Sequence, residues 1–256
     1  MDLVSALILG LIQGFTEWLP IPSSGHLVIA QALMKLDVPA AFDILIMIGT
    51  IGALLLYFRD RVLWLVFGLF GRDPRALRYI GLMVLAGLFT AIIGFPGKAL
   101  FEGLFHQPFV VSLLIVVTGI FLLLVSKFSL PRPDALGPAS AILIGIAQGI
   151  AVAPGISRSG STIGTGMLLG VGPKEAAEFS FLVGVPSMIV ASLFELKDAV
   201  AVGLDPVTML VGIVAAFVAG YASIGFFMKI LEAGNLKWFG YYCVIAGLAF
   251  AALTFG

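Results

Sequence analysis

Two short stretches place side chains that could do chemistry inside an otherwise apolar chain. The first, residues 13–26, reads QGFTEWLPIPSSGH and combines an amide, a carboxylate, serines and an imidazole. The second, residues 154–162, reads PGISRSGST and sets one arginine among small hydroxyl residues. Polar and ionisable side chains are costly at membrane depth, so clusters of this kind indicate a functional site.

The second stretch has the features of an anion site. Pro154-Gly155 breaks a helical pattern, and a new helix is expected to begin near Ser157. Free N–H groups and the positive dipole end of such a helix attract anions. Arg158 adds a planar fork suited to phosphate oxygens, and further donors come from Ser157, Ser159 and Thr162. The alternative is purely structural: the serines only cap helices, and Arg158 only pairs with Glu17.

The first stretch offers a nucleophile, an acid or base, and oxygen ligands. Gln13 and Glu17 are four residues apart, so they share a helix face and are candidate ligands for a divalent cation, Mg²⁺ or Ca²⁺. Ser23 and His26 are alternative nucleophiles, and His26 is also a candidate acid or base near neutral pH. Ser24, at the expected start of the next helix, is a candidate phosphate donor.

Two further acids stand near the starts of expected membrane spans. Asp43 and Glu178 are 135 residues apart. They either line a cavity or cap their helices, and the residues alone leave both readings open.

The composition places these stretches in a membrane protein. Of 256 residues, 61% are hydrophobic and only 11% are charged, and the mean hydropathy is +1.16. Several apolar runs match the length that a helix needs to cross hydrocarbon, about 20 residues. The net charge of zero gives no argument for nucleic-acid binding. A single cysteine, Cys243, excludes an internal disulfide and a cysteine-based metal cage.

We expect an all-α, polytopic fold with six transmembrane helices and two re-entrant helical hairpins. The first hairpin spans residues 2–34 with its break at Pro20 and Pro22, and the second spans about 139–170. The six spans are expected at about 41–58, 79–97, 108–126, 174–194, 207–229 and 239–255.

Basic residues orient these spans. If the loops 59–78, 127–138 and 229–238 are cytoplasmic, ten Lys and Arg residues lie inside and three lie outside, with Arg158 left within the membrane. Both termini then face the outside.

An internal repeat connects the two polar stretches. Without gaps, a shift of 135 residues aligns Gln13 with Gln148, Ser24-Gly25 with Ser159-Gly160, and Asp43 with Glu178. We expect a single domain, 1–256, with one repeat at about 1–126 and the other at about 139–256. Each repeat holds three crossings, so the second is inverted relative to the first, and the two hairpin tips meet near the midplane.

The two stretches resemble the undecaprenyl-diphosphate phosphatases linked to bacitracin resistance. The (E/Q)xxxE motif and SxGH segment of that family match Gln13, Glu17, Ser23, Gly25 and His26. Its PGxSRSxxT motif is matched in full by Pro154, Gly155, Ser157, Arg158, Ser159 and Thr162. Pro22 departs from the pattern, since many members have a small hydroxyl residue there.

The resemblance implies an enzyme of the cytoplasmic (inner) membrane. Such an enzyme uses Mg²⁺ or Ca²⁺ to remove the terminal phosphate from a polyprenyl diphosphate at the outer face. It thereby recycles the lipid carrier of cell-wall or glycan synthesis and confers bacitracin resistance. A flippase for polyprenyl phosphate is the alternative, because inverted repeats with broken helices are also a transporter plan. Whether the chain works alone or as a homodimer is left open.

Overall fold

The computed structural model describes residues 1–104, 106–132, 135–202 and 205–254, which form helices and no strand. The first six helices are α1 (Leu3–Glu17), α2 (Ser23–Met34), α3 (Ala40–Tyr57), α4 (Arg59–Phe70), α5 (Pro74–Leu104) and α6 (Pro108–Phe128). The other five are α7 (Pro138–Ile150), α8 (Arg158–Leu168), α9 (Pro173–Val202), α10 (Pro206–Glu232) and α11 (Lys237–Thr254). The expected all-helical class is confirmed.

Among the described residues, four helices are long and apolar enough to cross a membrane: the Pro74–Gly97 part of α5, and α6, α10 and α11. α3 and α4 together form a fifth candidate, bent by 80°. α1 and α7 are shorter apolar helices, as expected for the first arms of two broken pairs. Each of the six expected spans overlaps a helix, but α9, which holds the expected span at about 174–194, is not among these candidates. Residue 255, the expected end of the last span, lies outside the described residues.

The basic segment 59–78, which we expected to be a loop, is largely helical. Residues 62–70 are mostly apolar and contain no proline, so α4 continues until Gly71. Arg72 then adopts a left-handed backbone with φ 55°, and α5 starts at Pro74. The cluster of arginines concealed this short helix in the sequence pattern.

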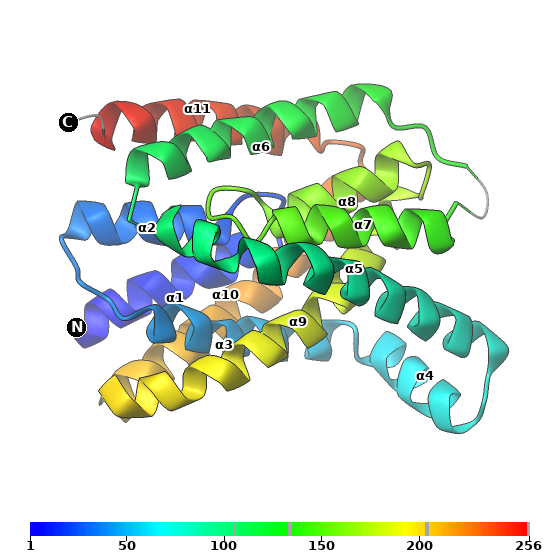
Figure 1. Ribbon diagram of the computed structural model, residues 1–256, viewed down its shortest axis with the longest axis horizontal. Coiled ribbons are helices and arrows are strands. Elements are labelled where there is room, and N and C mark those ends of the chain that lie inside the picture. The colour runs from blue at the N-terminus through cyan, green and yellow to red at the C-terminus, as the bar shows by residue number, and fades with distance from the viewer. Residues whose placement is uncertain (105, 133–134, 203–204, 255–256) are drawn as a thin grey trace.

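The helices are arranged around the two breaks. α6 and α11 lie side by side along one edge of the molecule, and α1 packs along α10. Both termini lie at one end, whereas α4, the end of α6 and the start of α7 lie at the other (Figure 1).

Glycines bring two helix pairs into close backbone contact. A Cβ added at Gly14 of α1 would lie 2.5 Å from the carbonyl oxygen of Ala216 in α10. A Cβ at Gly149 of α7 would lie 3.0 Å from the carbonyl oxygen of Thr90 in α5. Small residues allow such approach between membrane helices. The equivalent glycines thus allow α1 to pack closely against α10, and α7 against α5, just before each break.

The helix that follows the first break has no side-chain cap. The N-cap of α2 is Pro22, which offers no side-chain hydrogen bond, so Ser23 is the first helical residue rather than a cap. The hydroxyl of Ser23 is thus available for another partner.

α6 is hydrogen-bonded to the second break through Thr118. Ser157 is the N-cap of α8, as expected, and accepts a hydrogen bond from the Gly160 N–H at 3.0 Å. The Thr118 hydroxyl donates to the Gly155 carbonyl at 3.0 Å and accepts from the Ser157 N–H at 3.2 Å. Gly155 itself has φ +93°, a left-handed conformation that favours glycine.

We predict that Gly155→Ala destabilises the protein by about 1–3 kcal/mol, because the added methyl would sit in left-handed backbone, 2.5 Å from the Val111 carbonyl oxygen. Thermal unfolding in detergent measures the effect. Gly87→Ala in α5 is the control, since nothing lies within 4 Å of that position. Equal unfolding temperatures for the two variants would contradict the prediction.

Candidate active site

A cavity of about 300 Å³ lies where the two breaks meet. Its polar lining comes from the end of α1, the starts of α2 and α8, and the neighbouring helices α3, α5, α7 and α9. The expected site residues that line it are Gln13, Glu17, Ser23, Ser24, Arg158 and Ser159. The structure therefore brings the two polar stretches together, as the sequence predicts.

Glu17 and Arg158 form a buried ion pair across the two breaks. Nη2 of Arg158 lies 2.5 Å from Oε1 of Glu17, and the two side chains are 15% and 4% exposed. The sequence left open whether Arg158 binds phosphate or only pairs with Glu17. The pair is present, and both of its residues also line the cavity. Two charges in such a place are tolerated because each neutralises the other.

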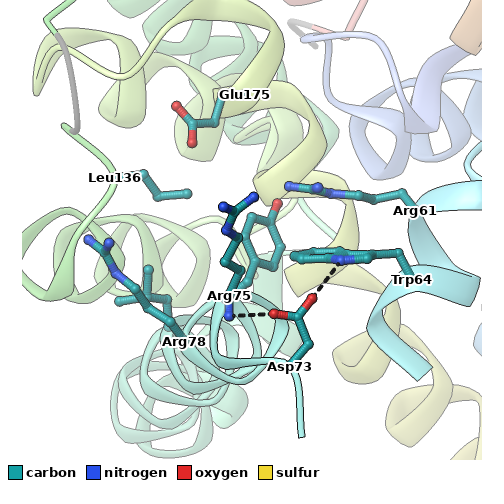
Figure 2. A pocket seen from close by; sticks show the side chains of 9 residues that line it. Arg61, Trp64, Asp73, Arg75, Arg78, Leu136 and Glu175 are labelled. Atoms are coloured by element: carbon teal, nitrogen blue, oxygen red, sulfur yellow. Dashed lines mark hydrogen bonds between the residues drawn. The ribbon is translucent and has the colours of Figure 1, made fainter. Parts of the chain in front are cut away.

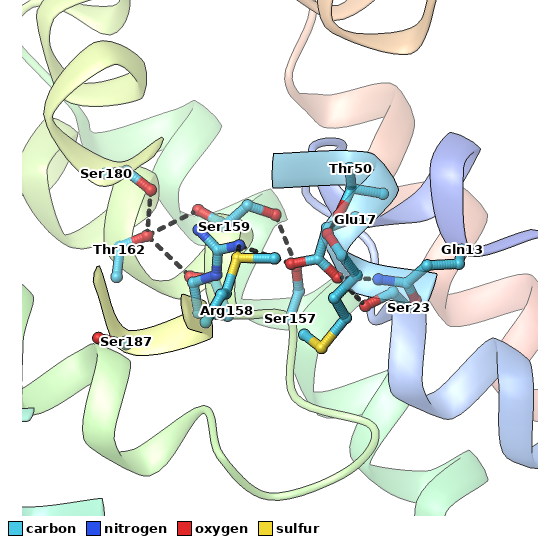
Figure 3. Close-up of polar contacts among 12 residues, drawn as sticks. Gln13, Glu17, Ser23, Thr50, Ser157, Arg158, Ser159, Thr162, Ser180 and Ser187 are labelled. Atoms are coloured by element: carbon cyan, nitrogen blue, oxygen red, sulfur yellow. Dashed lines mark hydrogen bonds and ion pairs between the residues drawn. The ribbon is translucent and has the colours of Figure 1, made fainter. Parts of the chain in front are cut away.

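The second carboxylate oxygen of Glu17 accepts two more hydrogen bonds. Gln13 Nε2 donates to Oε2 at 2.8 Å, and the Ser23 hydroxyl donates to it at 2.7 Å. Figure 3 shows Gln13, Glu17 and Ser23 converging from α1 and α2. A hydroxyl that donates to a buried carboxylate has the arrangement that a nucleophile and its base require.

Arg158 is fitted closely into its place. Its Cζ lies 5.0 Å from the ring centroid of Trp18, a cation–π contact. Any side chain at position 184 of α9 would collide with the guanidinium, so Gly184 provides the space for it. Nη1 of Arg158 is buried and has no hydrogen-bond partner among the described residues. This donor is available for an anion in the cavity.

Three expected phosphate donors have partners within the protein. The Ser159 hydroxyl lines the cavity and donates to the Leu19 carbonyl at 2.5 Å, which joins the two breaks. Ser157 caps α8, and Thr162 donates to the Arg158 carbonyl at 2.7 Å and contacts the Ser180 hydroxyl. Ser157 and Thr162 do not line the cavity. They hold the helix start that carries Arg158 (Figure 3).

His26 faces away from the cavity, toward α11. Its Nδ1 lies 2.7 Å from the Pro22 carbonyl oxygen, and its Nε2 lies 2.8 Å from the Tyr242 hydroxyl. A carbonyl only accepts, which assigns a proton to Nδ1; in the neutral imidazole, Nε2 then accepts from the Tyr242 hydroxyl. The imidazole also stacks on the Tyr242 ring, with centroids 5.7 Å apart.

The structure decides where Asp43 lies, a question that the residues alone left open, and it adds lining residues that were not singled out from the sequence. Asp43 lines the cavity and accepts two hydrogen bonds from Gln31, whereas Glu178 lies elsewhere, near Arg61. Gln148, Thr90 and Ser187 add further polar groups. Gln148 is the repeat partner of Gln13, so the 135-residue shift carried the signal that marks it.

The chain matches the family model described as bacitracin resistance protein BacA over residues 6–249. It is 38% identical to the undecaprenyl-diphosphatase of Carboxydothermus hydrogenoformans, over 99% of this chain and 98% of that protein. The undecaprenyl-diphosphatase of Methanosphaera stadtmanae is 34% identical, over 97% of this chain and 96% of its own. That of Halothermothrix orenii is 37% identical, over 99% of both chains. This chain therefore belongs to the bacitracin resistance protein BacA family.

Proposed function

We propose that this protein is a membrane phosphatase that hydrolyses undecaprenyl diphosphate to the monophosphate and inorganic phosphate. The observation that carries the proposal is the meeting of Glu17 and Ser23 with Arg158 in one buried cavity. The names of the relatives supply the substrate. The apolar part of the lining, with Ile21, Leu27 and Met47, suits the first units of a prenyl tail.

Arg158 binds the diphosphate in this proposal. Its unpartnered Nη1 donates to a phosphate oxygen, together with first-turn N–H groups of α2 and α8. The incoming phosphate competes with Glu17 for the guanidinium. Binding therefore weakens the Glu17–Arg158 pair and leaves the carboxylate free to accept a proton.

Ser23 then attacks the terminal phosphorus while Glu17 Oε2 takes its proton. The new bond joins Ser23 Oγ to phosphorus, and the bond from phosphorus to the bridging oxygen breaks, which releases the monophosphate. Water hydrolyses the phosphoserine and restores Ser23. Glu17 rather than His26 is the base here, because Ser23 donates to Glu17 and both ring nitrogens of His26 have other partners. Attack by His26 itself is the alternative route, and it requires the imidazole to leave Tyr242.

The protein supplies only part of the ligand shell that a divalent cation would need at this site. Among the described residues, no group of three or more His, Cys, Asp or Glu side chains could hold a metal ion. Mg²⁺ commonly takes one or two carboxylates and completes its shell with phosphate oxygens and water. Glu17 and the amide oxygen of Gln13 would hold the ion. When bound, it neutralises phosphate charge.

The inverted repeat stays part of the proposal. It is supported by the equivalent seating of α1 on α10 and of α7 on α5, and by the two breaks that open on one cavity. We propose six crossings, with repeats at about 1–126 and 139–256. The site opens to the outer face of the cytoplasmic membrane. There the reaction recycles the carrier for cell-wall synthesis and counteracts bacitracin.

The purified protein is predicted to release inorganic phosphate from undecaprenyl diphosphate in detergent with Mg²⁺ or Ca²⁺. Arg158→Ala should lower the rate by about 10³-fold or more, as for arginines that neutralise a transferring phosphoryl group. Arg158→Lys keeps the charge and tests whether the fork is needed, and Lys127→Ala is the control outside the cavity. No release with any divalent cation would favour the flippase. Near-normal release by Arg158→Ala would refute the site.

The nucleophile is identified by trapping the phospho-enzyme with substrate labelled in its terminal phosphate. We expect an acid-stable label on Ser23, absent from Ser23→Ala and present in Ser24→Ala. An acid-labile label that persists in Ser23→Ala would instead assign the attack to His26.

Tyr242→Phe tests the position of His26. The change keeps the ring stack but removes the hydroxyl that bonds Nε2, so we expect a loss of about 0.5–1.5 kcal/mol in the free energy of unfolding. Tyr241→Phe, at the exposed neighbouring position, should have no effect. Equal stability of both variants would mean that Tyr242 does not hold His26.

A further inference from the structure

A second cavity, of about 470 Å³, lies at the end of the molecule opposite the termini. It is formed mainly by α4 and the start of α5, and it shares no lining residue with the active-site cavity. Figure 2 shows three arginines, Arg61, Arg75 and Arg78, around its opening. None of them belongs to the motifs of the proposed active site.

Arg61 is held in place by two aromatic rings. Its Cζ lies 4.3 Å from the ring centroid of Trp64 and 4.7 Å from that of Tyr79. Its nearest described carboxylate oxygen, on Glu178, is 3.7 Å from Nε, which is an ion pair without a hydrogen bond. The guanidinium is therefore pre-positioned but keeps donor capacity for a ligand.

Tyr79 contributes a second unpartnered donor. The residue is 7% exposed and lines the cavity, yet its hydroxyl has no hydrogen-bond partner among the described residues. A buried hydroxyl without a partner costs about 1–3 kcal/mol, so it calls for a ligand or bound water. The Tyr79 hydroxyl and Arg61 Nε are therefore two buried donor atoms at the cavity that have no hydrogen-bond partner among the described residues.

The cavity is lined by three arginines and by only two acidic residues, Asp73 and Glu175. Asp73 already accepts from Trp64 Nε1 at 3.2 Å and from the Arg75 N–H at 2.9 Å, so it serves the start of α5. Glu175 lies across the cavity from Arg75 and Arg78 (Figure 2), and no ion pair joins it to either within the described part of the chain.

We propose that this cavity is a second anion site, which binds a phosphate-bearing ligand through Arg61, Arg75, Arg78 and the Tyr79 hydroxyl. Arginine forks and a hydroxyl donor match phosphate oxygens. Two sources have this chemistry: the headgroup of an anionic phospholipid and free phosphate. α4 exposes Phe67 and Phe70 at 68% and 81%. Exposed apolar side chains are typical of a helix that lies in a bilayer interface, and this position would bring a lipid headgroup to the opening.

Binding is tested with the full chain in detergent, by native mass spectrometry and thermal shift. The probes are dihexanoyl phosphatidylglycerol, dihexanoyl phosphatidylcholine and sodium phosphate. An Arg158→Gln background removes binding at the active site, and the wild-type chain is measured in parallel. Arg75→Gln/Arg78→Gln changes exposed side chains at the opening. Arg59→Gln/Lys127→Gln removes the same charge from exposed positions outside the cavity.

We expect Arg75→Gln/Arg78→Gln to weaken binding of the anionic probe by about tenfold or more, and the control pair to leave it unchanged. Tyr79→Phe, which removes only the hydroxyl, should weaken it by about two- to tenfold. Binding of phosphatidylglycerol but not of phosphate identifies a lipid ligand; binding of both shows that the phosphate group alone is sufficient for recognition. Equal binding by the two charge variants, or unchanged binding by Tyr79→Phe, would overturn the proposal. Phosphatase activity is measured separately and does not enter this result.

Discussion

The buried pair of Glu17 and Arg158 is the interaction on which the rest of this structure depends. It joins residues that are 141 positions apart, from two different broken helices. Either charge alone would be strongly unfavourable at this depth, since removing one partner of a buried pair costs about 3–5 kcal/mol. The fold therefore has to keep the two breaks in a fixed position relative to each other. It does so with the Ser159 bond to Leu19, the bracing of the second break by Thr118 and the glycine contacts of α1 and α7.

The same pair links stability to the proposed chemistry. In the structure, Arg158 neutralises Glu17, and Glu17 in turn accepts from Gln13 and Ser23. A phosphate in the cavity offers Arg158 a second anionic partner. In the proposed reaction, binding of the anion thus strengthens the base that activates Ser23. Preorganised charge of this kind contributes most of the catalysis in phosphoryl transfer.

Much of this site could be predicted because its signals are local. Proline and glycine mark the breaks, and Gln13, Glu17, Ser23 and Arg158 stand out as polar residues in apolar surroundings. The paired breaks also follow from the repeat, although its inverted topology remains a proposal.

Other features depend on packing between distant segments. His26 is hydrogen-bonded to Tyr242, 216 residues away, and the space for Arg158 depends on Gly184. Neither residue carries a local signal. α4 was missed for a different reason: the five arginines in 59–78 indicated a polar loop and concealed the short helix.

A double-mutant cycle tests the central claim, that the two breaks form one site through Glu17 and Arg158. The free energy of unfolding is measured for Glu17→Gln, Arg158→Gln and the double variant, with the exposed pair Arg59 and Asp60 as reference. We expect the double variant to lose about 1–3 kcal/mol less than the sum of the single losses, and the exposed pair to show little coupling. Additive losses for Glu17 and Arg158, within about 0.5 kcal/mol, would contradict the account.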